Sequence, residues 1–313
     1  MFLADSWRDY ELIDCDSGEK LERWGEHLLI RPDPQIVWSL DQKERSPLWE
    51  AAAARYLRSK TGGGRWEVYR PLPDSWQIGY RDLSFGIKPM GFKHTGLFPE
   101  QAANWDWFSA LIQKRKGKPV SVLNLFAYTG GATVAAAKAG AAVCHVDAAK
   151  GMVNWAKENA ALSGLSEHPI RYIVDDVRKF VEREVRRGRK YDGIIMDPPS
   201  YGRGPGGETW KLEQELFGLI QLCMKVLSDA PLFFLANTYT TGLSGRVMEN
   251  IYTLTLKKRF GGHTDIDEVG IPITNQGLVL PCGCSSRRNK RFYRLCMAQD
   301  LPGEPQRPHG RKR

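Results

Sequence analysis

The feature that most constrains this chain is an Asp-Pro-Pro corner at the end of a short apolar run. Ile194 to Met196 are apolar, and Asp197, Pro198 and Pro199 follow directly. Such a run is typical of a strand buried inside a parallel sheet. Because proline cannot continue a central strand, the chain must leave the sheet there. The sequence predicts an open α/β sheet with a rigid acidic turn at the edge where such sheets bind ligands, although an ordinary strand exit has the same pattern.

A glycine turn lies upstream between two further predicted strands. The first strand covers residues 120–125 and leads through 126–130 into an Ala-rich helix, and the second strand ends in Asp147. Gly130 and Gly131 allow the backbone to approach a ligand closely. The helix N-terminus favours an anion, and Asp147 can accept hydrogen bonds from both hydroxyls of a ribose. This order indicates a nucleoside-binding half of a doubly wound fold.

The spacing of the glycines discriminates between nucleoside cofactors. A dinucleotide site needs G-x-G-x-x-G, whereas residues 129–134 read Thr-Gly-Gly-Ala-Thr-Val. S-adenosylmethionine has a ribose and an adenine but no phosphate, so one glycine turn is sufficient. An acceptor for its adenine is available, because the strand predicted at 170–174 ends in Asp175 and Asp176.

Several strings then resemble one family. They are Thr95 to Gln101, Asn124 to Gly130, Val146-Asp147, Asp175 to Val177 and Asp197 to Ser200, in order over roughly residues 90–297. The chain resembles class I S-adenosylmethionine-dependent methyltransferases, and among them the bacterial family related to the large-subunit ribosomal RNA cytosine-C5 methyltransferases. The resemblance implies a Rossmann-like, seven-stranded α/β sheet and S-adenosyl-L-methionine as cofactor. It also implies cofactor contacts from Phe98, Gln101, Asn124, Phe126, Tyr128, Thr129, Gly130, Asp147, Ala148, Asp175, Asp176, Val177 and Asp197.

The acceptor side departs from the cytosine-C5 family. Methylation of that carbon needs a cysteine thiolate, which the family carries just after the fifth strand, but residues 235–241 contain no cysteine. Cys282 and Cys284 are the remaining candidates. We therefore expect a base nitrogen as acceptor, held by Asp197 and the Pro198 carbonyl, with Tyr201 stacking on the ring unless it is simply a packed or surface residue. The catalytic set expected is Asp197, Pro198, Pro199, Ser200 and Tyr201.

The composition of the chain limits the kinds of partner and the location that we expect. The 313 residues carry a net charge of +9, which favours a polyanion, and we expect RNA, ribosomal RNA in particular. The basic cluster 287–291 is the expected phosphate contact. No apolar run approaches the ~20 residues of a membrane helix, and no signal peptide is evident, so we expect a cytoplasmic protein. The spacing of Cys282 and Cys284 does not suit zinc, and no metal is expected.

The composition and residue patterns along the chain predict three regions. Residues 1–90 read as a small β-rich unit with one helix at 46–59, residues 91–300 as the methyltransferase domain, and residues 301–313 as a basic disordered tail. The last strand of the domain is expected at 291–297. Two other functions stay open: methyl transfer to a protein or small molecule, and a catalytically inactive RNA-binding relative.

Overall fold

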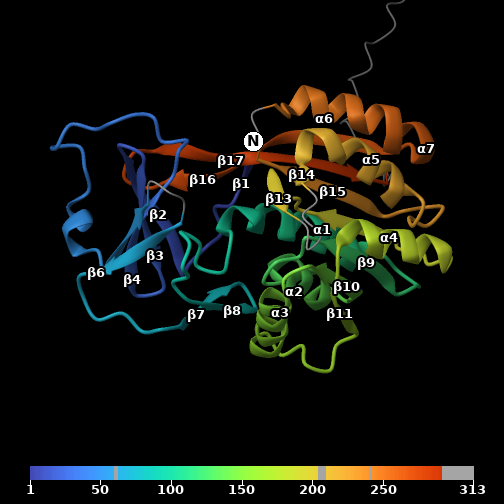
Figure 1. Cartoon of the computed structure of the whole chain (residues 1–313), viewed down its shortest axis with the longest axis horizontal. Coiled ribbons are helices and arrows are strands. Elements are labelled where there is room, and N and C mark those ends of the chain that lie inside the picture. The colour runs from blue at the N-terminus through green and yellow to red at the C-terminus, as the bar shows by residue number, and fades with distance from the viewer. Residues whose placement is uncertain (60–62, 204–208, 240–241, 291–313) are drawn as a thin grey trace, which may run out of the picture.

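One large sheet organises the computed structural model, which describes residues 1–59, 63–203, 209–239 and 242–290 (Figure 1). In spatial order its strands are β11 (Ile170–Val174), β10 (Ala141–Asp147), β9 (Val120–Leu125), β12 (Gly193–Met196), β15 (Phe233–Thr238), β17 (Leu278–Asn289), β16 (His263–Ile273), β2 (Tyr10–Asp16), β3 (Glu19–Trp24), β4 (His27–Pro32), β5 (Ala54–Arg58) and β6 (Gly64–Val68), and β1 (Phe2–Leu3) pairs with β16. Two small hairpins lie outside this sheet: β7 (Trp76–Tyr80) with β8 (Leu83–Ile87), and β13 (Tyr201–Arg203) with β14 (Thr209–Lys211).

The first seven strands of this order form the sheet that the resemblance implied. The five from β11 to β15 are parallel, and β17 is antiparallel to both of its neighbours. The helices are α1 (Ala102–Lys114), α2 (Gly131–Lys138), α3 (Lys150–Leu162), α4 (Val177–Arg186), α5 (Leu212–Met224), α6 (Gly245–Tyr252) and α7 (Lys258–Phe260), with 3-10 turns η1 (Pro47–Ala51) and η2 (Pro99–Gln101) and a π-helical turn η3 (Thr253–Lys257). The predicted Rossmann-like α/β class is confirmed.

Side-chain alternation along the central strands builds two cores. On β12, Ile195 packs with α1, α2 and α3, whereas Ile194 and Met196 pack with α4, α5 and α6. On β15, Phe233 and Phe234 divide in the same way. Because neighbouring residues of a strand point to opposite faces, these continuous apolar runs fill both sides of the sheet.

The N-terminal strands extend this sheet. Figure 1 shows the long β16 and β17 reaching toward β2, and Ile273 pairs there with Leu12. The backbone N–H groups of Thr274 and Asn275 donate to the carbonyls of Leu12 and Ile13 over 3.0 and 2.9 Å. The seven-stranded sheet is therefore continuous with the β-rich unit.

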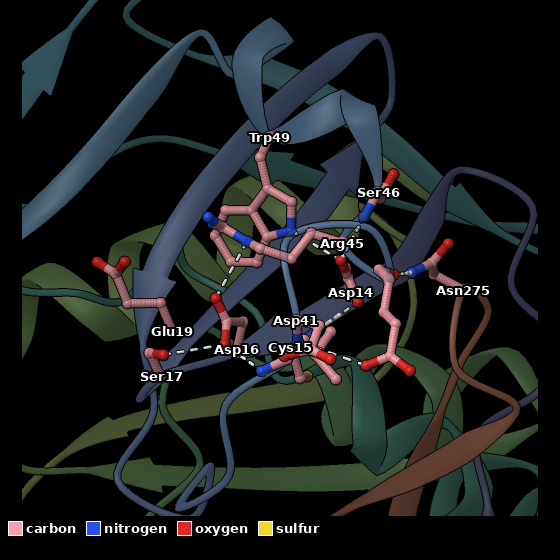
Figure 2. Close-up of polar contacts among 12 residues, drawn as sticks. Asp14, Cys15, Asp16, Ser17, Glu19, Asp41, Arg45, Ser46, Trp49 and Asn275 are labelled. Carbon is pink, nitrogen blue, oxygen red and sulfur yellow. Dashed lines mark hydrogen bonds and ion pairs between the residues drawn. The ribbon is translucent and has the colours of Figure 1, made fainter.

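A buried carboxylate anchors this junction (Figure 2). Oδ2 of Asp14 accepts hydrogen bonds from the backbone of Ser46 and the indole of Trp49, both over 2.8 Å. Oδ1 accepts from Nε2 of Gln276 over 2.7 Å. One fully buried side chain thus connects the turn before η1 to the β16–β17 hairpin, and these partners offset the cost of its burial.

The structure overturns the helix expected at 46–59. Only Pro47–Ala51 is helical, and Ala54–Arg58 forms β5 between β4 and β6. Ala54 and Tyr56 are buried on β5, so sheet pairing overrides the helix propensity of the alanine run.

The structure contains a long strand that the sequence did not predict. β15 pairs with β17 at Leu278–Asn289, and the predicted strand at 291–297 lies outside the described residues, as does the predicted tail. Within the described ranges, the helices are too short or too polar to cross a membrane.

Candidate active site

A cavity of about 1420 Å³ opens at the carboxyl ends of β9, β10, β12 and β15. On one side it is lined by many of the predicted residues: Phe98, Phe126, Tyr128, Asp147, Ala148, Asp176, Val177, Asp197, Pro198, Pro199 and Ser200. The opposite wall comes from the N-terminal unit and includes Lys20, Arg31 and Asp33. A smaller adjoining cavity contains predicted residues that the large one lacks, namely Gln101, Asn124 and Thr129.

The turn after β9 has an unusual backbone. Phe126, Tyr128 and Gly130 have φ of 54°, 49° and 83°, in the left-handed region that only glycine adopts without strain. The N–H of Tyr128 donates to Oδ2 of Asp147 over 2.8 Å, and the N–H of Gly130 donates to the carbonyl of Ala127 over 2.9 Å. Strain of this kind persists at functional sites, where surrounding contacts impose it.

Gly130 also has no room for a side chain. A Cβ placed there would lie 2.7 Å from the Cβ of Ala156 on α3. The turn therefore packs directly against α3. Gly130 itself lines neither cavity, so it acts by shaping the turn.

Asp147 is fixed at the end of β10. Its Oδ2 accepts from the N–H of Tyr128, and its Oδ1 accepts from the N–H of Ala149 over 2.9 Å. Each carboxylate oxygen can accept a second hydrogen bond. Two adjacent acceptors held in this way suit a pair of neighbouring hydroxyl groups.

The next two acids differ in environment. Asp176 caps α4, since its Oδ1 accepts from the N–H of Lys179 over 2.9 Å, and it lines the cavity with Val177. Asp175 lies outside both cavities. Its carboxylate pairs with Arg183 and accepts from the N–H of Asp176 over 2.8 Å. Through these two contacts Asp175 holds the end of β11 in place.

Asp197 occupies the corner predicted from sequence. Its Oδ2 accepts a hydrogen bond from the hydroxyl of Tyr239 over 3.3 Å. Its Oδ1 is buried and finds no hydrogen-bond partner among the described residues. Burial, and then the nearby carboxylate of Glu100, raise the pKa of Asp197 to about 7. An orphaned buried acceptor is costly unless a ligand supplies the donor.

The aromatic residue expected beside this corner is not the one that lines the cavity. Tyr201 is 55% exposed and lies outside both cavities. Trp210, on the paired strand β14, lines the large cavity, donates from its indole to the Pro199 carbonyl over 2.6 Å and contacts the ring of Phe126. Pairing of β14 with β13 places Trp210 beside the cavity. Sequence spacing does not reveal this pairing.

Other cavity residues carried little or no sequence signal. Glu100 was part of a matched string without an assigned role, and it lines the cavity while only 8% exposed. Tyr239 reaches the cavity from the end of β15, and Lys20 and Arg31 reach it from β3 and β4. The charges of the N-terminal unit are paired, because Arg31 contacts Glu22 over 2.6 and 2.7 Å and Lys20 contacts Asp33 over 3.1 Å.

The two candidate thiols both line the cavity. Cys282 is buried and Cys284 is partly buried, and burial raises the pKa of each thiol. A raised pKa keeps a cysteine in its neutral form, which is a weak nucleophile. Neither environment resembles that of an activated cysteine.

The basic patch expected at 287–291 is wrong for its first two residues. Arg287 and Arg288 are 6% and 2% exposed. Arg288 donates to the carbonyls of Pro231, Phe260 and Gly261, and Arg287 donates to Asn104 and lies over the ring of Phe2. Both guanidinium groups therefore serve packing, since β17 is paired on both edges and the two side chains contact α1 and α7 on opposite faces of the sheet.

Together, the doubly wound sheet, the strained glycine turn and the acids at successive strand ends define a nucleoside-binding protein of the class I methyltransferase fold. The sequence profile described as S-adenosylmethionine-dependent methyltransferase matches residues 28–225. The chain belongs to this family. Family membership confirms the predicted enzyme class and S-adenosylmethionine as the cofactor.

Individual relatives agree. The crystal structure of a SAM-dependent methyltransferase from Agrobacterium tumefaciens is 35% identical, with a TM-score of 0.84, over 92% of this chain and 93% of that one. Ribosomal RNA large subunit methyltransferase K of Neisseria meningitidis is 27% identical over 82% of this chain and 72% of its own length. Methyltransferase K/L of Colwellia psychrerythraea is 30% identical, but the chain spans only 33% of that protein.

Proposed function

We propose that this chain transfers the methyl group of S-adenosylmethionine to a nitrogen atom of an RNA base, with ribosomal RNA as the substrate. The observation that carries the choice of acceptor is the orphaned Oδ1 of Asp197 beside the rigid Pro198-Pro199 corner. In its ionised form this oxygen only accepts hydrogen bonds, and the exocyclic amines and N–H ring nitrogens of bases are donors that would satisfy it. A ribosomal substrate implies a cytoplasmic location.

The residues present fit the cofactor. Asp147 would accept hydrogen bonds from the ribose hydroxyls, and Asp176 with Val177 would hold the adenine. The methionine part would lie over the turn 126–130, near Phe98, Gln101 and Asn124, which line the smaller cavity with Asp197. The bound cofactor supplies an activated methyl group on a sulfonium, and the chain orients the acceptor and excludes water.

The two cavity thiols argue against cytosine C5 as the methyl acceptor. That reaction needs a thiolate that adds to the ring, and burial disfavours the thiolate of both Cys282 and Cys284. A nitrogen acceptor held by Asp197 needs no thiolate addition, because the nitrogen lone pair attacks the methyl group directly.

RNA as the partner is supported by the functions of the relatives and by the charge of the chain. The relatives from Neisseria and Colwellia are ribosomal RNA large subunit methyltransferases. The net charge of +9 favours a polyanion. In this proposal residues 1–90 form the unit that supplies the second wall of the cavity, and residues 91–300 form the methyltransferase domain.

Tritium transfer tests the proposal. The purified protein is incubated with labelled cofactor and with RNA, protein or metabolite fractions from a strain that lacks the gene, and the labelled RNA is digested to nucleosides. We expect label in a base-nitrogen methylated nucleoside, and Asp197→Asn should abolish it while still binding the cofactor. Label in 5-methylcytidine would overturn the nitrogen acceptor, label only in protein or metabolites would overturn RNA, and no label in any fraction would indicate an inactive RNA-binding relative.

A further inference from the structure

Glu100 is a buried acid that lines the cavity. The methyl-transfer reaction proposed above assigns it no role. It lies in η2, is 8% exposed and lines the large cavity. Across the described residues, no side chain forms a hydrogen bond or an ion pair with its carboxylate. Burying a carboxylate is costly, and here burial raises the pKa of Glu100, which the charge of Lys20 and a hydrogen bond from its own backbone N–H only partly offset. A fold that retains such a group in a ligand cavity holds it for a donor or a positive charge.

The position of Glu100 relative to Asp197 is fixed by a short chain of hydrogen bonds. Gln101, the next residue, donates from Nε2 to the hydroxyl of Tyr239 over 2.7 Å, and that hydroxyl donates to Asp197 over 3.3 Å. η2 is thereby held against the strand ends that carry Tyr239 and Asp197. The Glu100 carboxylate is close enough for its charge to act on Asp197, since Glu100 is the second-largest cause of the raised pKa of Asp197.

Glu100 faces the acceptor side of the cavity. Asp197 and Phe98 line both cavities, whereas Glu100 lines only the large one. The small cavity contains the residues assigned to the methionine part of the cofactor. Glu100 therefore lies outside the cavity assigned to the methionine part, and the charges of Lys20 and Arg31 from the N-terminal wall act on it.

The groups around the two acids come from several elements. Asn237 and Tyr239 at the end of β15 lower the pKa of Asp197, and Cys282 on β17 lies near Glu100. Lys20 on β3 and Arg31 on β4 favour the ionised form of Glu100, and Asp33 opposes them. Both cations are already paired with Asp33 or Glu22, so the site between Glu100 and Asp197 is acidic.

We propose that Glu100 is a second catalytic acid: with Asp197 it surrounds the acceptor nitrogen, stabilises the positive charge that methylation places there, and accepts the proton that an N–H acceptor then loses. This inference rests on the proposed function. In the step, the nitrogen lone pair forms the bond to the methyl carbon, and the carbon–sulfur bond breaks with its electron pair left on sulfur. The positive charge thus moves to nitrogen, and one N–H proton passes to the Glu100 carboxylate and from there to water.

Glu100→Gln tests this in single-turnover methylation of RNA across a pH range, beside calorimetry with the cofactor. Gln keeps the size of the side chain but not the charge. We expect the rate to fall at least 10-fold, cofactor affinity to stay within 2-fold, and the acid limb of the pH profile to move to lower pH, because Asp197 loses a negative neighbour. Glu268→Gln, an exposed acid at the cavity rim, is the matched control and should leave all three unchanged.

The possible results distinguish a failure of this inference from a failure of the proposed function. A wild-type rate and profile for Glu100→Gln would overturn this inference and leave the proposed function intact, whereas wild-type protein that methylates no RNA would overturn the proposed function. A loss of cofactor affinity of 10-fold or more would place Glu100 at the cofactor and overturn its role at the acceptor. If Glu100→Gln does not fold, Glu100→Asp, which keeps the charge, should retain the wild-type acid limb, and a displaced limb would count against the pair.

Discussion

The hydroxyl of Tyr239 donates a hydrogen bond to Oδ2 of Asp197, and it accepts one from Gln101 in turn. Two strand ends and the segment before α1 are connected by this one phenol. The hydrogen bond occupies one oxygen of Asp197 and leaves Oδ1 without a partner among the described residues. The orientation of the acid is therefore set before any substrate arrives.

Tyr239→Phe should shift the pH dependence of methyl transfer upward. The Tyr239 hydrogen bond stabilises the ionised carboxylate, so its loss raises the pKa of Asp197 beyond about 7. If the ionised acid holds the acceptor, the acid limb of the rate profile moves to higher pH, opposite to the shift expected for Glu100→Gln. The measurement is the single-turnover rate between pH 5.5 and pH 9, and a limb that stays in place would show that Asp197 does not control it.

Asp197→Asn should stabilise the protein at alkaline pH while it abolishes transfer. Because the folded-state pKa of Asp197 is raised to about 7, the protonated form is favoured in the fold, and the stability that it provides is lost as the pH rises toward and through that value. The variant avoids this loss. Its advantage in unfolding free energy should grow by about 2 kcal/mol between pH 5 and pH 8, measured by urea titration. A constant difference would mean that burial does not perturb this acid.

Gly130→Ala and Gly140→Ala form a matched pair. Both glycines have positive φ, 83° and 101°, but a Cβ at Gly130 meets Ala156 at 2.7 Å whereas a Cβ at Gly140 meets nothing within 4 Å. Gly140→Ala should cost about 1 kcal/mol of stability from backbone strain alone and should bind the cofactor normally. Gly130→Ala should cost more and weaken cofactor binding. Thermal unfolding and calorimetry measure the two effects, and equal costs would contradict the packing argument.

Arg288→Met should reduce stability and leave the salt dependence of RNA binding unchanged. The guanidinium of Arg288 is buried and donates to three backbone carbonyls, so its removal leaves them unsatisfied, at a cost of about 3 kcal/mol. The exposed neighbour Lys290 provides the control, since Lys290→Met should change stability by less than about 0.5 kcal/mol. A smaller salt slope for folded Arg288→Met would instead indicate a phosphate contact.

The sequence predicted the sheet edge well because local patterns determine it. Strand 120–125 and strand 170–174 have the bounds predicted, and of the two acids that follow the second strand, Asp176 lines the cavity. Apolar runs, glycines and prolines act over a few residues, so they can be read without the fold. β5 and β17 were missed because their pairing partners, not their own residues, make them strands.

The residues of the chain by themselves determined the α/β class, the phosphate-free nucleoside site and the Asp197 corner, since each depends on short-range backbone chemistry. Only the tertiary structure decided which side chains face that corner. Glu100, Tyr239 and Trp210 come from segments far apart in the chain, and burial among them, rather than residue type, raises the pKa of Asp197 and leaves its Oδ1 without a partner. Burial and long-range contact are properties of the packed fold, so no local pattern encodes them.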